Sequence, residues 1–133
     1  MNPKLPPQDD PQEWLNRAQS NLARAKSPVP GVYLEDNCFD AQQAAEKAIK
    51  AVFVARHERF PFIHDLEKLL GMLEKNGLKI PKYVRDADEL SMFAAVTRYP
   101  GELDRITPRI YRRAVRIAMS VVRWAERQVQ RAE

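Results

Sequence analysis

Cysteine and histidine are scarce in this sequence. It holds one cysteine, Cys38, and two histidines, His57 and His64. A lone cysteine cannot form an internal disulfide, and two histidines without a cysteine pair give no spacing that resembles a zinc site. We therefore expect no metal and no cofactor, and we interpret Cys38 as a small packing residue rather than a reactive thiol.

Long apolar runs are absent as well. No stretch approaches the roughly 18 to 20 apolar residues that a membrane-spanning helix needs. Residues 1–10 are rich in proline and acidic side chains, whereas a secretory leader is basic and then apolar. The sequence therefore predicts no membrane association and a cytoplasmic location.

The overall composition of the chain is typical of one folded domain. Hydrophobic residues make up 44% of the chain and charged residues 30%, which is ordinary for a globular protein and argues against disorder of the bulk chain. A length of 133 residues suits one compact core rather than two. We predict a flexible segment over residues 1–9 and a single helical domain over residues 10–133.

Positive charge is concentrated near the C-terminal end. The chain carries a net charge of +4, yet residues 107–133 alone hold seven arginines against Glu126 and Glu133. These arginines are Arg109, Arg112, Arg113, Arg116, Arg123, Arg127 and Arg131. The rest of the chain is therefore close to neutral, and a polyanion is a natural partner for the C-terminal segment.

Helix starts and stops are well marked in the first half of the chain. Asp10 can cap a helix whose first position is Pro11, and Pro28 ends it. A second helix is predicted from near Asp36 to about His57, because alanines and larger apolar residues recur there at helical spacing. Its alanines, which allow neighbouring helices to approach closely, are Ala41, Ala44, Ala45, Ala48, Ala51 and Ala55.

The second half repeats these signals. His64 or Asp65 can cap a third helix, which an Asn-Gly pair terminates. A fourth helix is expected to follow Pro81 and to end by Tyr99, and a fifth begins at the Thr-Pro pair of residues 107–108. No strand pattern appears, so we predict an all-α, up-and-down bundle of four main helices plus a short fifth.

Three motifs resemble those of one family. Residues 36–51 contain the run Phe-Asp-Ala-Gln-Gln-Ala-Ala-Glu-Lys-Ala, which is similar to the second helix of prokaryotic HEPN proteins. His-Asp-Leu at residues 64–66 and Arg-Tyr-Pro at residues 98–100 match the family's third helix and a later turn, in the family's order. The resemblance spans residues 12–130, and the combination of the three motifs makes it specific.

This resemblance implies further properties. HEPN proteins usually form homodimers, and the group that this chain resembles is commonly encoded beside a small nucleotidyltransferase as a toxin–antitoxin or stress module. Many members are metal-independent ribonucleases whose last helix carries an arginine followed a few residues later by a histidine. This chain departs from that pattern, because no histidine follows His64. The last helix therefore lacks the expected proton-transfer group.

An alternative cleavage site lies earlier in the chain. Arg59 and His64 have four residues between them. Metal-free RNA cleavage uses such a pair, one residue to neutralise phosphate charge and the other to move protons. A proline interrupts the segment, and polar residues at a helix start have the simpler task of capping. We therefore favour capping for His64 and Asp65 over catalysis or nucleotide binding.

Two further groups are candidates for binding a nucleotide or RNA. Gln42, Gln43 and Lys47 offer amide and ammonium groups to a base or a phosphate. A plain exposed face with a Glu-to-Lys pair, or a dimer or partner surface, explains them as well, and we favour the dimer or partner surface. Arg98 and Tyr99 suit single-stranded RNA, by phosphate contact and stacking, but a structural corner at a helix end is the favoured interpretation.

The arginines of the last helix form the most regular pattern. Five of them fall on one face at helical spacing: Arg109, Arg113, Arg116, Arg123 and Arg127. Such a strip would bind RNA through its phosphates, with strong salt dependence and little sequence preference. A solvated helix face, or a docking face for an acidic protein, is equally consistent with the pattern.

Two function hypotheses follow. The favoured one is a homodimeric HEPN subunit of a module with a small nucleotidyltransferase, which binds a nucleotide, RNA or the partner protein without cutting RNA. The alternative is a metal-independent ribonuclease toxin with an atypical site.

Overall fold

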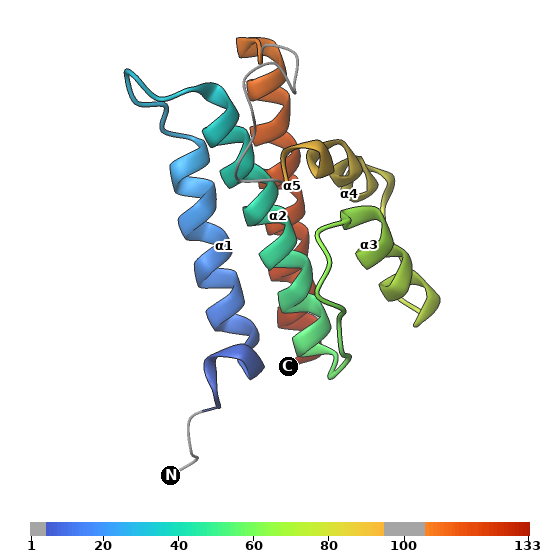
Figure 1. The fold of residues 1–133 in the computed structure, drawn as a ribbon. Coiled ribbons are helices and arrows are strands. Elements are labelled where there is room, and N and C mark those ends of the chain that lie inside the picture. The colour runs from blue at the N-terminus through green and yellow to red at the C-terminus, as the bar shows by residue number, and fades with distance from the viewer. Residues whose placement is uncertain (1–4, 95–105) are drawn as a thin grey trace.

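The computed structural model describes residues 5–94 and 106–133, and this part of the chain contains helices and no strand (Figure 1). The elements in chain order are η1 (Pro7–Asp9), α1 (Pro11–Ala25), α2 (Leu34–Ala55), α3 (Leu66–Lys75), α4 (Lys82–Arg85), η2 (Asp86–Phe93) and α5 (Pro108–Ala132). The predicted all-α class is confirmed, and the α-helices of the described residues are four longer ones and the four-residue α4.

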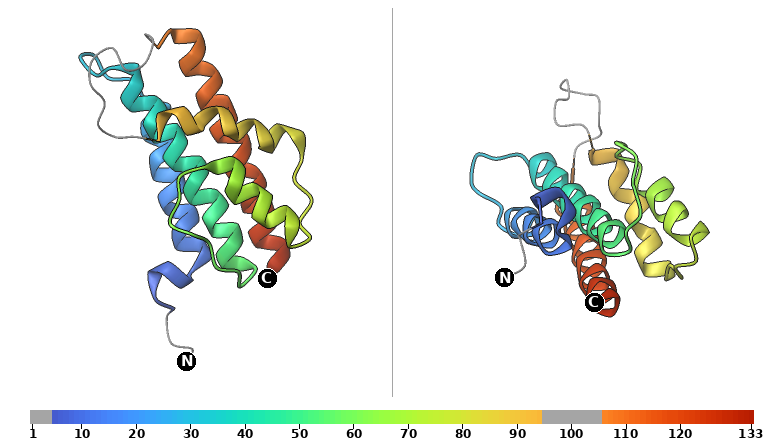
Figure 2. Two further views of the ribbon diagram at one scale, coloured as in Figure 1. Left: turned by 45° about the vertical axis from the view of Figure 1, so that its right-hand side comes forward. Right: turned by 90° about the horizontal axis from the view of Figure 1, so that it is seen from below.

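The helix α2 forms the centre of the molecule. It packs against α1, against α5 and against α3 and η2, which lie around it on different sides in the view from below (Figure 2). Alanines let these neighbours approach closely. Of the six that the sequence singles out, Ala41, Ala44, Ala45, Ala48 and Ala51 are completely buried, whereas Ala55 is partly buried. Because α2 is covered on nearly every side, its polar residues must find partners inside the protein.

The directions of the helices follow from contacts between distant residues. Asn21 in α1 bonds to Asp40 near the start of α2, and Tyr111 near the start of α5 donates to the carbonyl of Ala25 at the end of α1. The helix α1 is thus antiparallel to both, and α2 and α5 run in the same direction (Figure 1). Up-and-down order holds for α1 and α2, whereas the chain crosses back through α3, α4 and η2 before α5 begins.

Three predicted helix starts are confirmed in atomic detail. The side chains of Asp10, Asp65 and Thr107 each accept a hydrogen bond from a first-turn amide of α1, α3 and α5, at 2.9, 3.1 and 3.2 Å. Each bond satisfies a backbone donor that the helix itself leaves free. Capping near the start of α3 is therefore the task of Asp65 and not of His64.

The fourth predicted helix is different in the structure. In place of one α-helix, α4 ends after one turn and the chain continues as the 3-10 helix η2. Its buried apolar residues follow a strict three-residue spacing: Val84, Ala87, Leu90 and Phe93. A repeat of three keeps side chains on one face of a 3-10 helix, which has three residues per turn, but not of a long α-helix. The predicted end at Tyr99 lies outside the described residues.

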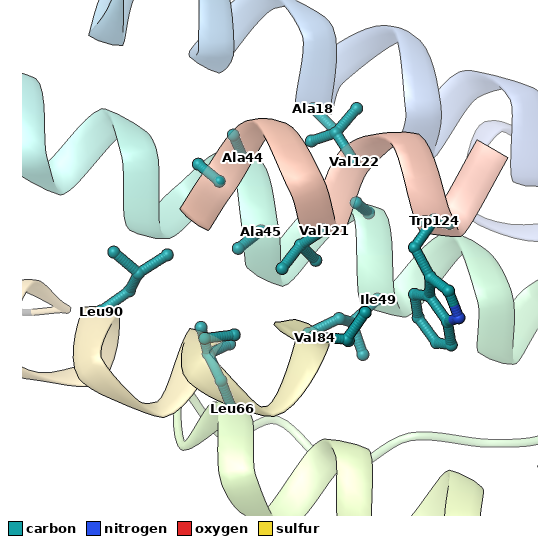
Figure 3. Close-up of a cluster of buried hydrophobic side chains, with 14 of the residues drawn as sticks. Ala18, Ala44, Ala45, Ile49, Leu66, Val84, Leu90, Val121, Val122 and Trp124 are labelled. Carbon is teal, nitrogen blue, oxygen red and sulfur yellow. The ribbon is translucent and has the colours of Figure 1, made fainter. Parts of the chain in front are cut away.

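The core joins side chains from every longer helix. Ile49 of α2, Leu66 of α3 and Trp124 of α5 meet in one cluster with residues of α4 and η2 (Figure 3). Cys38 is completely buried, and burial, helped by the charge of Glu35, raises the pKa of its thiol to about 12. The thiol is therefore neutral and inert at physiological pH, which agrees with the packing role predicted for it.

The N-terminal segment contains a short 3-10 turn at Pro7–Asp9. The indole of Trp14 donates to the carbonyl of Gln8 at 3.0 Å, which attaches this turn to α1. Flexibility of residues 1–9 as a whole stays a prediction. Within residues 5–94 and 106–133, no helix is both long enough and apolar enough to span a membrane.

Candidate functional site

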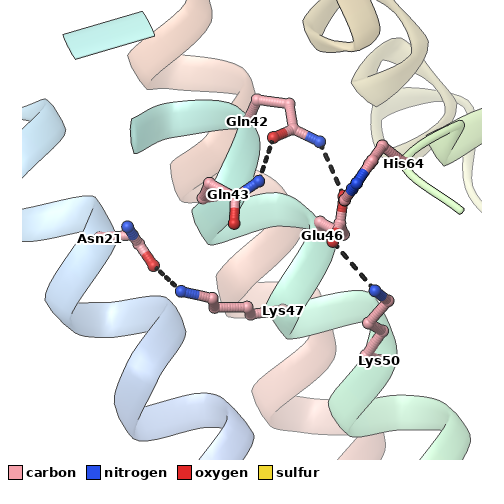
Figure 4. Close-up of polar contacts among 7 residues, drawn as sticks. All are labelled: Asn21, Gln42, Gln43, Glu46, Lys47, Lys50 and His64. Carbon is pink, nitrogen blue, oxygen red and sulfur yellow. Dashed lines mark hydrogen bonds and ion pairs between the residues drawn. The ribbon is translucent and has the colours of Figure 1, made fainter. Parts of the chain in front are cut away.

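A network of polar side chains runs along α2 and is largely buried. Asp40, Gln42, Glu46 and Lys50 are buried, while Gln43 and Lys47 are half-buried (Figure 4). The interpretation of this stretch as a plain exposed face is therefore wrong for Gln42 and Glu46, since neighbouring elements cover both. The preference for a dimer or partner surface stays a prediction.

Glu46 is the centre of this network. One carboxylate oxygen accepts from Gln42 at 3.0 Å and contacts Nδ1 of His64 at 2.8 Å, and the other accepts from Lys50 at 3.0 Å. Burial alone would raise the pKa of Glu46, but the hydrogen bonds of His64, Lys50 and Gln42 and the charge of Lys50 outweigh it, so the pKa lies below its ordinary value. Glu46 is therefore an ionised carboxylate held inside the protein.

His64 connects the segment before α3 to α2. Its side chain is 64% exposed, and Nδ1 faces the Glu46 carboxylate. Arg59, the other half of the predicted alternative cleavage pair, is exposed and makes no hydrogen bond or ion pair with His64 among the described residues. The structure therefore pairs His64 with an anion rather than with the arginine.

Lys50 has a second neighbour besides Glu46. Its ammonium lies 5.1 Å from the centre of the Phe60 ring, and Phe60 makes edge-to-face contacts with Trp14 and Phe53. The aromatic ring favours the cation where water is excluded. The segment that carries Phe60 and His64 is thus held to α2 at two points.

A second part of the network faces α1. Lys47 donates to Asn21 at 2.7 Å, and Asn21 donates to Asp40 at 3.1 Å. Burial, reinforced by the charge of Arg17, lowers the pKa of Lys47. Gln43 donates to Gln42 at 2.7 Å and so belongs to the part around Glu46. The candidates Gln42, Gln43 and Lys47 therefore fall into two separately bonded groups, both of which take part in contacts inside the protein.

The arginines of α5 form a separate exposed surface. All seven are exposed: Arg109, Arg112, Arg113, Arg116, Arg123, Arg127 and Arg131. They fall within about 100° of the helix circumference at 100° per residue. The opposite side of α5 is buried, with Ala114, Val121 and Ala125 in the core. We call these seven side chains the arginine face; the predicted strip is part of it.

Two members of the arginine face bond to the neighbouring elements α4 and η2. Arg113 makes a two-point ion pair with Glu89, at 2.6 and 2.5 Å, and this pairing lowers the pKa of Glu89. Arg127 donates to the hydroxyl of Tyr83 at 3.0 Å. The other five members make no hydrogen bond or ion pair with any described residue. The arginine face thus carries a large uncompensated positive charge.

Some participants were not predicted from the sequence. Lys50 could have been found, because it stands four positions after Glu46 on the same helix. Asn21 and Tyr83 carry no such signal, since their partners come from distant elements. Arg98 and Tyr99 lie outside the described residues, and their two interpretations stay predictions. No group of three His, Cys, Asp or Glu side chains within residues 5–94 and 106–133 is arranged to hold a metal ion.

Comparison with known proteins agrees with this architecture. The family model described as HEPN domain matches residues 11–128. The crystal structure of TT1696 from Thermus thermophilus is similar with a TM-score of 0.76 and 28% identity, over 89% of this chain and 97% of that one. ST0689, described as an archaeal HEPN homologue, has a TM-score of 0.71 and 24% identity, over 90% and 98% of the two chains. No curated protein matches the sequence.

Proposed function

Because the chain belongs to the HEPN domain family, we propose that it is a HEPN subunit that holds RNA on the arginine face of α5 without cutting it. The observation that carries this proposal is the exposure of all seven arginines on one side of one helix. Among the described residues only Glu89 neutralises a member of this set. A surface of this kind binds polyanions by releasing counterions from their phosphates.

The geometry around the histidine supports binding rather than cleavage. His64 contacts the carboxylate of Glu46, and among the described residues it makes no hydrogen bond with a member of the arginine face. Cleavage without a metal needs a proton-transfer group and a cation directed at one phosphate. The last helix supplies many cations and no histidine, whereas the α2 network supplies a histidine next to an anion. The two requirements are thus met by different elements of the structure.

A protein partner is part of the same proposal. By the resemblance of its motifs, the chain would act as a homodimer in a toxin–antitoxin or stress module with a small nucleotidyltransferase. The half-buried Lys47 and Gln43 supply an ammonium and an amide group that suit a nucleotide, whereas the completely buried Gln42 does not reach one. Co-purification of the chain with the nucleotidyltransferase encoded beside it would support this part. If no nucleotidyltransferase gene lies beside this one, or if the two proteins form no complex, the partner part of the proposal is wrong and only the RNA-binding part remains.

RNA binding is tested with a matched pair of charge variants. One replaces Arg112, Arg116 and Arg123 of the arginine face with Gln, and the control replaces the exposed Lys26, Lys68 and Lys75 elsewhere with Gln. Both lower the net charge of +4 by three. The arginine variant should bind single-stranded RNA more weakly and with a salt slope smaller by about one per arginine lost. If the control variant bound RNA as weakly as the arginine variant, the net charge of the protein alone would account for the binding.

The same samples separate binding from cleavage. With a chelator present, we expect RNA to stay intact in the wild type. Cleavage that disappears in both His64→Ala and Arg59→Ala would replace this proposal by the ribonuclease alternative. If the protein bound no RNA but the arginine face bound an acidic protein, that face would instead be a docking surface for a protein partner.

A further inference from the structure

Tyr83 of α4 lies beside the arginine face. Tyr83 is 45% exposed, while the next residue, Val84, is completely buried in the core. The hydroxyl of Tyr83 accepts a hydrogen bond from Arg127 of α5 at 3.0 Å. The aromatic ring is thus anchored at both ends, by its backbone in α4 and by its hydroxyl on α5, and much of the ring remains open to solvent.

The bond to Arg127 leaves the arginine charged. A tyrosine hydroxyl is neutral, so Arg127 keeps its full attraction for a phosphate, in contrast to Arg113, which Glu89 neutralises. Lys79 and Lys82, close to Tyr83 in the chain, are exposed as well. The end of the arginine face near Tyr83 therefore combines an open aromatic ring with several cations, whereas the end near Glu89 does not.

This combination suits one class of polyanion. Arginines alone attract duplex and single strands alike, because both expose phosphates. An open aromatic ring adds binding energy only for a base that is not already stacked in a duplex. Resting on the proposed RNA binding, we infer that Tyr83 is a stacking residue for an unpaired base, and that the RNA held on the arginine face is single-stranded.

The test compares one RNA in two forms. A short uridine- and adenine-containing strand, alone and annealed to its complement, is titrated with the wild type and with Tyr83→Ala, Tyr83→Phe and Tyr33→Ala. Tyr33 is also an exposed tyrosine, but it lies in the turn between α1 and α2. Circular dichroism and thermal unfolding show that each variant is folded.

We expect Tyr83→Ala to weaken binding of the single strand by about 5- to 160-fold and to leave duplex binding unchanged, because one stacked base contributes about 1–3 kcal/mol. Tyr83→Phe keeps the ring and should retain most of the affinity, and Tyr33→Ala should change nothing. An equal loss for duplex and single strand, or the same loss in Tyr33→Ala, would overturn the inference.

The two proposals fail in different ways. If the wild type binds both RNA forms and Tyr83→Ala alters neither, only the stacking role is wrong and the arginine face still binds RNA. If the wild type binds neither form at low salt, the proposed function is wrong and the inference falls with it.

Discussion

Nδ1 of His64 lies 2.8 Å from the buried carboxylate of Glu46, although 18 positions separate the two residues in the chain. This contact fastens the segment before α3 to the central helix. Glu46 and Lys47 are adjacent in the sequence but do not bond to each other. Glu46 bonds to Lys50 and His64, whereas Lys47 bonds to Asn21.

Removing both partners of the Glu46–Lys50 pair should cost less than the sum of the two single removals. The two side chains are 5% and 8% exposed, so Glu46→Met leaves the Lys50 ammonium buried without its anion. We expect the free energy of unfolding to fall by about 3–5 kcal/mol in the single variant, and by less than the sum of the two singles in the double variant with Lys50→Met. Urea unfolding measures all four proteins. Strictly additive losses would show that the pair is not coupled.

The stability should depend on pH through Glu46. Its pKa in the folded protein lies below the ordinary value of 4.5, so the carboxylate stabilises the fold above that pH and loses this effect as pH falls through the lowered pKa. Urea unfolding between pH 7 and about pH 3 should therefore show a shallower acid loss in Glu46→Gln than in the wild type. Glu67→Gln, on the exposed side of α3, is the control. Parallel pH curves for wild type and Glu46→Gln would contradict the assignment.

His57 adopts a backbone conformation that favours glycine. Its φ is 58°, just after the end of α2, where a side chain with a Cβ is strained. We expect His57→Gly to raise the free energy of unfolding by about 0.5–1 kcal/mol, because relief of strain exceeds the added freedom of the unfolded chain. Thermal unfolding measures the change. His57→Ala keeps the Cβ and should give no such gain; an equal gain in both variants would point to loss of the imidazole instead.

The alanines of α2 set the distance to its neighbours. Ala48 is completely buried, so a larger side chain there has no space without moving a helix. Ala48→Leu should lower the free energy of unfolding by about 1–3 kcal/mol, measured by urea unfolding. Ala23→Leu on the exposed side of α1 is the matched control and should be nearly neutral. A neutral Ala48→Leu would mean that the packing around α2 is looser than described.

Much of the fold could be predicted from local signals. Asp10, Asp65 and Thr107 cap helices where the sequence placed helix starts, because a cap and its amide are at most three residues apart. The arginine face also follows from spacing alone, since all its members belong to one helix. Such patterns depend only on neighbours within a turn or two.

The helix after Pro81 shows the limit of this reasoning. After Leu90, the apolar residues Phe93 and Ala94 offer a three-residue and a four-residue spacing respectively. The structure buries Phe93, which continues the three-residue spacing of a 3-10 helix. The sequence after Pro81 suits an α-helix and a 3-10 helix almost equally well. Packing against α2, α3 and α5 decides which of the two forms.

By itself, the sequence determined that the chain is helical, where most helices begin, and that positive charge gathers on one side of the last one. Only the tertiary structure decided that α2 is covered on nearly every side, that Glu46 meets His64, and that Tyr83 meets Arg127. The physical reason is that these contacts join side chains from different helices. Their partners are chosen by how buried faces pack and by the need to satisfy polar groups inside the core, which no spacing along the chain encodes.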